Sequence, residues 1–391
     1  MMRTLQQIVA VTTVNIVSLP QRLWASLVIV VGMACVVGVL LSMLSFSVGL
    51  ARSIEAAADP GRAIVIRGGA RDEFGFVIPR EAVTAILNAP GMRIDADRQP
   101  IASPENINLV PVTRREGQLP VRMIVRGVGP KAFALRPEFK LVSGRMFRPG
   151  THELVAGTAA QAQFEHLNVG NKVMMPDGEW EIVGSFETGG DLIEGQLLGD
   201  VETVMASRRS NAYGSVIVRL ESPDTFETFS KALLENPALD IDVRRQSDFY
   251  EQTAGQFTTF YTTVAYLLGA IIGVGALFGT VNIMHSAVAV RTREIATLRA
   301  LGYGAAPVAI SVLAEALLLA TAGALIGAAM AWFLFDGNRN SYGGMVVFDL
   351  AVTPHLFVIG VLWALGIAFL GAAIPAIRAA RVPVATALRA M

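Results

Sequence analysis

Cysteine and charge are both scarce in this sequence. It has one cysteine, Cys35, among 391 residues, and charged residues make up only 16% of it, whereas soluble globular proteins average about 25%. A single cysteine cannot form a disulfide within the chain, so every folded part must be held together by its own hydrophobic core. The low charge and a hydrophobic content of 53% argue against an ordinary soluble enzyme and indicate an integral membrane protein.

Motifs of nucleotide and metal chemistry are also missing. No segment matches GxxxxGK[ST], and all four lysines lie between residues 52 and 251, so we expect no Walker-type ATP site. The glycines around Gly273 imitate a dinucleotide fingerprint but follow no predicted strand. The pairs His152–Glu153 and Glu165–His166 lack the HExxH spacing. We therefore predict a chain without metal site, catalytic residues or cofactor of its own.

Four charge-poor stretches predict four membrane-spanning helices. The first, residues 23 to 51, runs for 29 residues without charge, about twice the apolar region of a signal peptide, so we expect it to be retained. The second, residues 252 to 290, is too long to lie within one bilayer as a helix. Its polar beginning predicts a helical stalk outside the membrane, and we place residues 264 to 287 in the bilayer. The expected segments are an amphipathic cytoplasmic helix (1–22), the first span and stalk (23–58), an exported domain (59–246), a stalk and second span (247–290), a cytoplasmic coupling segment (291–304), the third span (305–335), a short periplasmic loop (336–352), the fourth span (353–377) and a cytoplasmic tail (378–391).

Basic residues near the spans predict the orientation. The loop between the third and fourth spans carries one, Arg339, beside Asp336 and Asp349, so we place this loop outside and both termini in the cytoplasm. The exported segment, residues 52 to 251, has 23 basic and 28 acidic residues, which makes it a poor nucleic-acid binder. Eight basic residues flank the spans on the other side: Arg3, Arg22, Arg291, Arg293, Arg299, Arg378, Arg381 and Arg389.

The exported domain has a mixed α and β pattern. A unit of strand, helix, turn and strand occurs near its beginning, with a strand at 63–67 and a helix at 81–87, and again at its end, between residues 215 and 244. The segment between them is rich in strand and turn patterns, including a hairpin around residues 176 to 178. We expect an α+β domain in which a sheet subdomain, residues 59–111 and 205–246, carries a projecting inserted subdomain, residues 112–204.

Within the spans, one acid and several glycines are informative. Glu315 interrupts the third span and is costly in lipid, so we expect it to pair with a basic group near the cytoplasmic end of the bundle, with a proton or substrate site as the alternative. Glycines at GxxxG spacing let helix backbones approach closely, and packing within one chain and a dimer seam both remain open. These glycines are Gly269 with Gly273, Gly275 with Gly279, and Gly323 with Gly327.

The segment after the second span suggests a docking site. If the helix continues past Val290, then Arg291, Glu294 and Leu298 share one face, with Arg299 one position round from it. Topology alone explains the arginines but does not explain Glu294, because acids contribute little to orientation.

Several segments together resemble the MacB/FtsX/LolC-type ABC transporter permeases. Residues 290–302 (VRTREIATLRALG) are similar to the cytoplasmic coupling segment of that family, and Glu315 occupies its recurrent acidic position. Residues 143–147, 168–171 and 181–184 resemble its periplasmic core pattern. The resemblance covers essentially the whole chain. Its C-terminal signature corresponds to Pro375, Arg378, Arg381, Pro383 and Arg389.

The resemblance implies a non-catalytic permease subunit of a type VII, mechanotransmission ABC transporter in the bacterial inner membrane. No ATPase domain is fused to this sequence, so a separate cytoplasmic ATPase would bind ATP and Mg and dock on the permease. A second permease copy is expected, with a homodimer favoured over a heterodimer, and a periplasmic adaptor is a further expected partner. The residues that would couple to the ATPase are Arg291, Arg293, Glu294, Leu298 and Arg299.

Two functions follow from this resemblance. The first is export or extraction of a substrate on the periplasmic side, driven by a shape change of the exported domain. The alternative is an FtsX-like regulatory permease that activates a periplasmic partner and transports nothing. The large two-part exported domain favours transport, and the absence of a cytoplasmic catalytic domain disfavours a third possibility, a self-contained membrane sensor.

Overall fold

The chain divides into two compact units. A computed structural model describes residues 2–17, 23–74, 77–115, 120–342 and 346–382. The helical unit comprises Met1–Val48, Thr259–Asp336 and Ala351–Met391, and the α/β unit comprises Gly49–Thr258 and Gly337–Leu350.

The described residues contain four long apolar helices. Each of α2, α7, α9 and α10 is long and apolar enough to cross a membrane. The helix α10 begins with a proline at its first position, where the backbone N–H needs no partner within the helix. The helix α7 is continuous over 45 residues, so the expected stalk and the second span form one helix. The helices are α1 (Met2–Val17), α2 (Leu23–Ala56), α7 (Gln246–Val290), α8 (Thr292–Ala300), α9 (Ala305–Phe335) and α10 (Pro354–Ala380).

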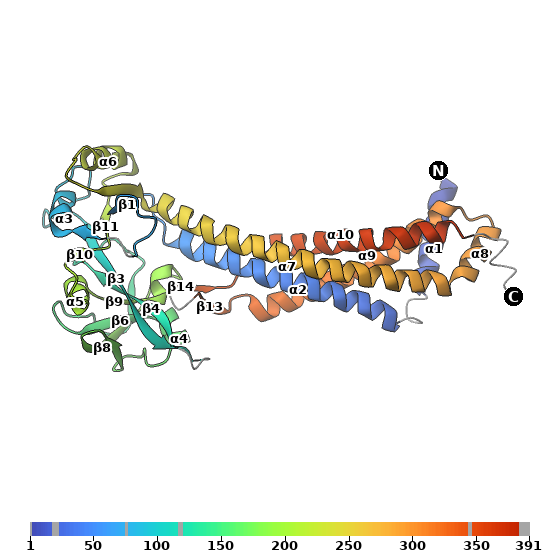
Figure 1. The fold of residues 1–391 in the computed structure, drawn as a ribbon, viewed down its shortest axis with the longest axis horizontal. Helices are drawn as coiled ribbons and strands as arrows, with labels where there is room; N and C mark the ends of the chain where they lie inside the picture. The colour runs from blue at the N-terminus through green and yellow to red at the C-terminus, as the bar shows by residue number, and fades with distance from the viewer. Residues whose placement is uncertain (1, 18–22, 75–76, 116–119, 343–345, 383–391) are drawn as a thin grey trace. The chain divides into compact units, whose positions relative to one another are not determined.

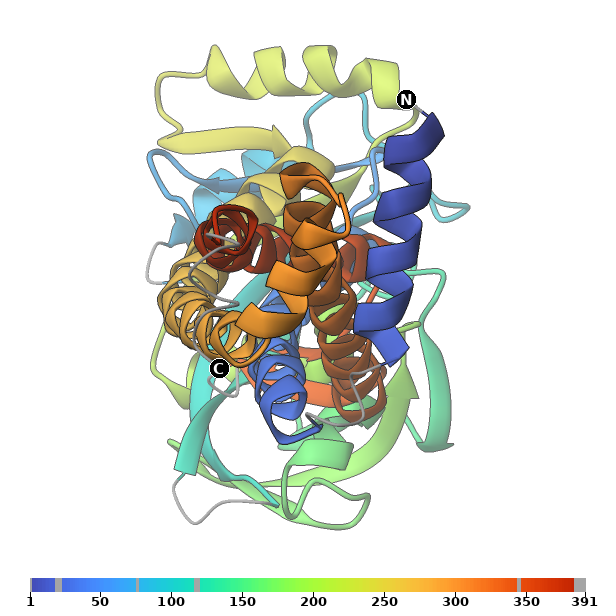
Figure 2. The ribbon, with the colours of Figure 1, turned by 90° about the vertical axis from the view of Figure 1, so that its right-hand side faces the viewer.

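Close helix contacts hold the helical unit together. An added Cβ at Gly327 would lie 2.4 Å from the carbonyl oxygen of Ala34, and one at Gly323 would lie 2.5 Å from that of Val30, so α9 packs backbone to backbone against α2. The same helix packs against α10 and against α1, and Figure 2 shows α1 at the edge of the bundle beside α9. Apolar side chains from α2, α7, α9 and α10 fill one shared core.

One continuous path of strands runs through the α/β unit (Figure 1). Its order is β12-β1-β11-β3-β4-β9-β6-β8-β5, with β7 paired to β8. Two short pairs lie off this path: β2 with β10, which are distant in sequence, and the hairpin of β13 with β14. The strands are β1 (Arg62–Arg67), β2 (Ile78–Pro79), β3 (Ala102–Thr113), β4 (Pro120–Val128), β5 (Lys140–Gly144), β6 (Glu153–Gly157), β7 (Lys172–Met175), β8 (Gly178–Glu187), β9 (Leu197–Asp200), β10 (Ala212–Tyr213), β11 (Ser215–Arg219), β12 (Ile241–Arg245), β13 (Arg339–Tyr342) and β14 (Val346–Asp349).

The strand β3 joins the two parts that the sequence predicted as separate subdomains. Its first residues pair with β11 and its later residues pair with β4. The expected insert therefore does not project from a finished sheet, because a strand of 12 residues is long enough to belong to both parts. The expected boundary at residue 112 falls inside this strand. The short helices of the unit are α3 (Arg80–Leu87), α4 (Thr158–Gln163), η2 (Leu192–Gly195), α5 (Val201–Ser207), η3 (Pro223–Thr225) and α6 (Phe226–Leu234).

The two largest hydrophobic cores among the described residues of the α/β unit lie along this strand path. One is formed by α3, α6 and the strands around β1, and it includes Ile86 and Phe229. The other surrounds Trp180 and Phe164 beside β4, β6 and β8. The second core also contains Val347 from β14, which belongs to the loop between α9 and α10. That loop is therefore an integral part of the α/β unit.

Candidate functional site

Arg291 breaks the helix between α7 and α8. The expectation that the second span continues past Val290 is wrong, since α7 ends at Val290, Arg291 is the non-helical N-cap of α8, and α8 begins at Thr292. Arg291 turns inward instead, and its Nη1 donates a hydrogen bond of 2.9 Å to Oε2 of Glu315. Both side chains are buried. Glu315 thus has a basic partner of the kind expected, and Arg291 is buried whereas Glu294 is exposed.

A second contact fastens α8 to α10. The Arg299 guanidinium donates to the backbone carbonyl of Ala380, in the last turn of α10. Carbonyls in the last turn of a helix lack partners within the helix, and a cation there also stabilises the helix dipole. Ile295 and Ala296 are buried on the same side of α8. The inner face of α8 is therefore held by two arginine contacts and an apolar seam.

The outer face of α8 is polar and borders a cavity. Arg293 and Glu294 are exposed, and Leu298 is half-buried. Arg291, Glu294 and Leu298, which the sequence placed on one face, line a cavity of about 320 Å³ together with Glu315 and apolar residues of α1, α7 and α9. Of the five predicted coupling residues, Arg293 and Glu294 are exposed, Leu298 and Arg299 are half-buried, and Arg291 is buried.

The predicted glycine pairs have different surroundings. An added Cβ at Gly269 would lie 3.1 Å from Leu40, and one at Gly273 would lie 3.0 Å from Ile367, so this pair packs within the chain. Gly323 and Gly327 also pack within the chain, against α2. The pair at Gly275 and Gly279 has no atom within 4 Å of an added Cβ.

The C-terminal signature is only partly described. Pro375 is buried within α10, Arg378 is exposed in its last turn, and Arg381 is exposed at its C-cap. Pro383 and Arg389 lie outside the described residues.

A buried charge network lies in the α/β unit. Arg126 of β4 donates to Glu73, Glu105 and Gln196, and Arg136 donates to the other carboxylate oxygen of Glu105. Burial alone would raise the pKa of Glu105, but Arg136 and Arg126 hold it below its ordinary value. The network ties β3 and β4 to the segments before β2 and β9.

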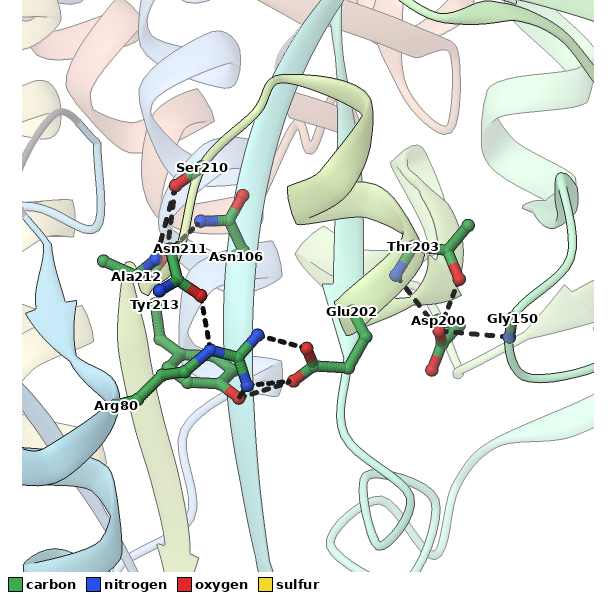
Figure 3. Close-up of polar contacts among 10 residues, drawn as sticks. All are labelled: Arg80, Asn106, Gly150, Asp200, Glu202, Thr203, Ser210, Asn211, Ala212 and Tyr213. Carbon is green, nitrogen blue, oxygen red and sulfur yellow. Dashed lines mark hydrogen bonds and ion pairs between the residues drawn. The ribbon is translucent and has the colours of Figure 1, made fainter.

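A polar cluster connects α3 with α5 (Figure 3). Arg80 forms an ion pair with Glu202 and donates to Asn211 Oδ1 at 2.6 Å. The hydroxyl of Tyr213 also donates to Glu202, at 2.5 Å. The Arg80 hydrogen bond lowers the pKa of Glu202, while burial and Glu202 raise the pKa of Tyr213 to about 12. α5 contributes Val201 and Met205 to the first core and Val204 to the second, so the cluster fastens α3 to a helix that belongs to both halves of the unit.

Sequence reasoning missed both of these clusters. Their members are separated by 20 or more residues in most cases, and no motif connects them. The available signals were charged residues within strand sequences, such as Glu105 in β3 and Arg126 in β4.

Two family profiles together cover most of the chain. Residues 25–235 match the MacB-like periplasmic core domain, and residues 258–384 match the FtsX-like permease C-terminal family. The chain belongs to the MacB/FtsX-type family of ABC transporter permeases. The resemblance stated from the sequence is therefore confirmed. Permeases of this family are membrane components of ABC transporters, and membership implies a cytoplasmic ATPase partner.

Two further comparisons complete this picture. The crystal structure of the extracellular domain of the noncanonic ABC-type transporter YknZ from Gram-positive bacteria is 14% identical to the permease, with a TM-score of 0.36, and the match covers 47% of this chain and 99% of that chain. The comparison with curated proteins gave no match. With four candidate spans and an α/β domain inserted after the first, the permease is a multi-pass membrane protein.

Proposed function

We propose that this permease couples ATP hydrolysis by a separate cytoplasmic ATPase to a conformational change of its periplasmic α/β unit, and so drives export or extraction of a substrate on the periplasmic side. In this proposal the protein lies in the bacterial inner membrane with both termini and α8 in the cytoplasm. ATP and Mg are bound by the ATPase. The observation that carries the proposal is α8, a short helix fastened on one face and charged on the other.

The two arginine contacts of α8 explain how a displacement of this helix would be transmitted to neighbouring helices. Arg291 connects it to α9 through Glu315, and Arg299 connects it to the end of α10. A displacement of α8 by a docked ATPase would therefore be passed to both helices rather than absorbed by a loose loop. Exposed Arg293 and Glu294 give the partner charged groups to recognise.

Three covalent routes lead from the helical unit into the α/β unit. Two are the helices α2 and α7, which are continuous over 34 and 45 residues and cross from one unit into the other. The third is the β13–β14 hairpin, which follows α9, precedes α10 and places Val347 in the same core as Trp180. Movement of the spanning helices would thus act on the α/β unit at three positions, which supports a mechanical role for that unit.

The partner copy is also part of the proposal. We expect a homodimer, and Gly275 and Gly279 are the pair whose surface is open to close approach by another helix. A periplasmic adaptor would bind the α/β unit. The regulatory alternative uses the same cytoplasmic coupling, and it differs only in what the α/β unit acts on.

Charge reversal at Glu294 tests the coupling. We expect Glu294→Lys to leave membrane insertion and thermal stability unchanged but to weaken ATPase pull-down, or to separate ATP hydrolysis from transport, because reversing an interfacial charge can cost several kcal/mol. The matched control is Glu227→Lys, which reverses an exposed acid on α6. Wild-type pull-down and wild-type coupled hydrolysis in the Glu294→Lys permease would refute α8 as the docking site.

A second measurement separates transport from regulation. The native complex is purified, and every bound protein and lipid is identified. A molecule that leaves the complex when ATP is hydrolysed supports transport. A stably bound hydrolase whose activity rises with ATP supports the regulatory alternative.

A further inference from the structure

A small cavity lies inside the α/β unit, away from the coupling site. It has a volume of about 140 Å³. Its walls come from the last turns of α2, the first turns of α7, β4 and η2, and they are mainly apolar, with Leu50, Ile54, Ile124 and Phe249 among them. An apolar cavity of about 150 Å³ can take up one molecule of benzene. The space therefore suits one ring-sized apolar group.

The phenol of Tyr250 also lines this cavity. Tyr250 on α7 is only 7% exposed. A tyrosine hydroxyl can both donate and accept a hydrogen bond. It can therefore accept a hydrogen bond from a polar group of a ligand in the cavity.

The charge of the lining selects the kind of ligand. Two carboxylates, Asp72 and Glu73, face one guanidinium, Arg126, so the lining has an excess of one negative charge. Arg126 already makes four hydrogen bonds, to Gln196, Glu105 and both oxygens of Glu73, and it has little capacity left for an anion. Asp72 is exposed, and only its Oδ1 is engaged, by the backbone N–H of Phe74. A cationic group would therefore be favoured beside Asp72.

We propose that this cavity binds a ligand that carries a ring-sized apolar group next to a protonated amine, with the apolar group among Ile54, Ile124 and Phe249 and the amine between Asp72 and the hydroxyl of Tyr250. This site deepens the proposed transport function by giving the substrate a chemical class, and it rests on that function only in identifying the ligand as the substrate. Binding itself requires neither ATP nor the ATPase. Failure of this proposal is thus distinguishable from failure of the coupling proposal.

The test measures binding of three probes to the full-length permease in nanodiscs without nucleotide. Benzylamine is the cationic probe, and benzyl alcohol and benzoate are its neutral and anionic counterparts with the same ring. Ligand-observed NMR titration is expected to show saturable binding of benzylamine, weaker binding of benzyl alcohol and no binding of benzoate. Equal binding of benzyl alcohol and benzylamine, or stronger binding of benzoate, overturns the proposal.

Variants locate the site. Asp72→Asn is expected to weaken benzylamine binding about tenfold with little change for benzyl alcohol, whereas Asp224→Asn, which alters an exposed acid at η3, leaves both unchanged. Leu192→Phe fills the cavity from a partly exposed position and is expected to abolish binding of both probes. Phe257→Trp is a second filling variant from the rim, in case the first disturbs the fold. Wild-type benzylamine binding in both folded filling variants overturns the proposal.

Discussion

Arg291, at the break between α7 and α8, forms a buried ion pair with Glu315 of α9. The distance from Nη1 to Oε2 is 2.9 Å, and the two side chains are 5% and 6% exposed. The pair joins the segment that would meet the ATPase to a helix of the bundle. Its position explains why an acid can lie within the third apolar stretch.

Removing one member of this pair should destabilise the permease. In Glu315→Leu, the Arg291 guanidinium remains buried without its carboxylate, and such uncompensated charges cost about 3–5 kcal/mol. We expect a lower thermal unfolding temperature in detergent. The double variant Arg291→Leu with Glu315→Leu should recover most of the loss, because no buried charge remains.

Glu294→Gln is the matched control, since it neutralises an exposed acid of α8 and should leave the unfolding temperature unchanged. If Glu315→Leu unfolds at the wild-type temperature, the ion pair contributes nothing to the bundle.

The glycine pairs should respond differently to larger side chains. Gly327→Ala places a methyl group 2.4 Å from the carbonyl oxygen of Ala34, so α9 must move from α2 and thermal stability should fall. Gly275→Leu with Gly279→Leu has open space on its side and should leave the stability of the single chain unchanged. If this open face is the dimer seam that we propose, the same double variant should lower the dimer fraction in a crosslinking or light-scattering measurement. An unchanged dimer fraction would mean that Gly275 and Gly279 do not lie in the dimer interface.

The spans were predictable because their physical signal is local. Charge-free runs and their flanking arginines gave the third span at residues 305 to 335, where the structure has α9, and placed the start of the first span at Leu23, where α2 begins. The exported strands and helices were equally local, since alternation and Asn or Pro stops marked β1, α3 and α6.

The missed features depend on tertiary contacts. Glu73, Glu105 and Arg126 are brought together by strand pairing, and no sequence spacing encodes that meeting. The helix break at Arg291 has no proline or glycine that would have predicted it, and its buried contact with Glu315 joins residues that are 24 positions apart. Val347 looked like one valine in a short loop, and only the fold places it in the core of another segment.

Val347 gives a third prediction. Val347→Ala should lower the unfolding temperature of the α/β unit. The loss of buried methyl groups leaves a cavity, which lowers the free energy of unfolding by about 1–2 kcal/mol. The control is Val142→Ala on β5, where the valine is 52% exposed and the change should have little effect. Thermal unfolding of the full chain, followed by tryptophan fluorescence, to which buried Trp180 of the same core contributes, measures both. Equal unfolding temperatures for the two variants would mean that the hairpin does not support this core.

The last prediction concerns acid stability. The pKa of Glu105 in the folded protein lies below its ordinary value of 4.5, because Arg136 and Arg126 outweigh the effect of burial. Its stabilising contribution is therefore fully present above pH 4.5 and is lost as the pH falls through the folded-state pKa. Glu105→Gln should lower the unfolding temperature at pH 7, since Arg136 loses its carboxylate partner. The gap in unfolding temperature between this variant and the wild type should narrow steadily below pH 4.5. Glu165→Gln, at an exposed position, should show no gap at either pH. A gap that stays constant from pH 7 to pH 3 would contradict the ionic origin of this stabilisation.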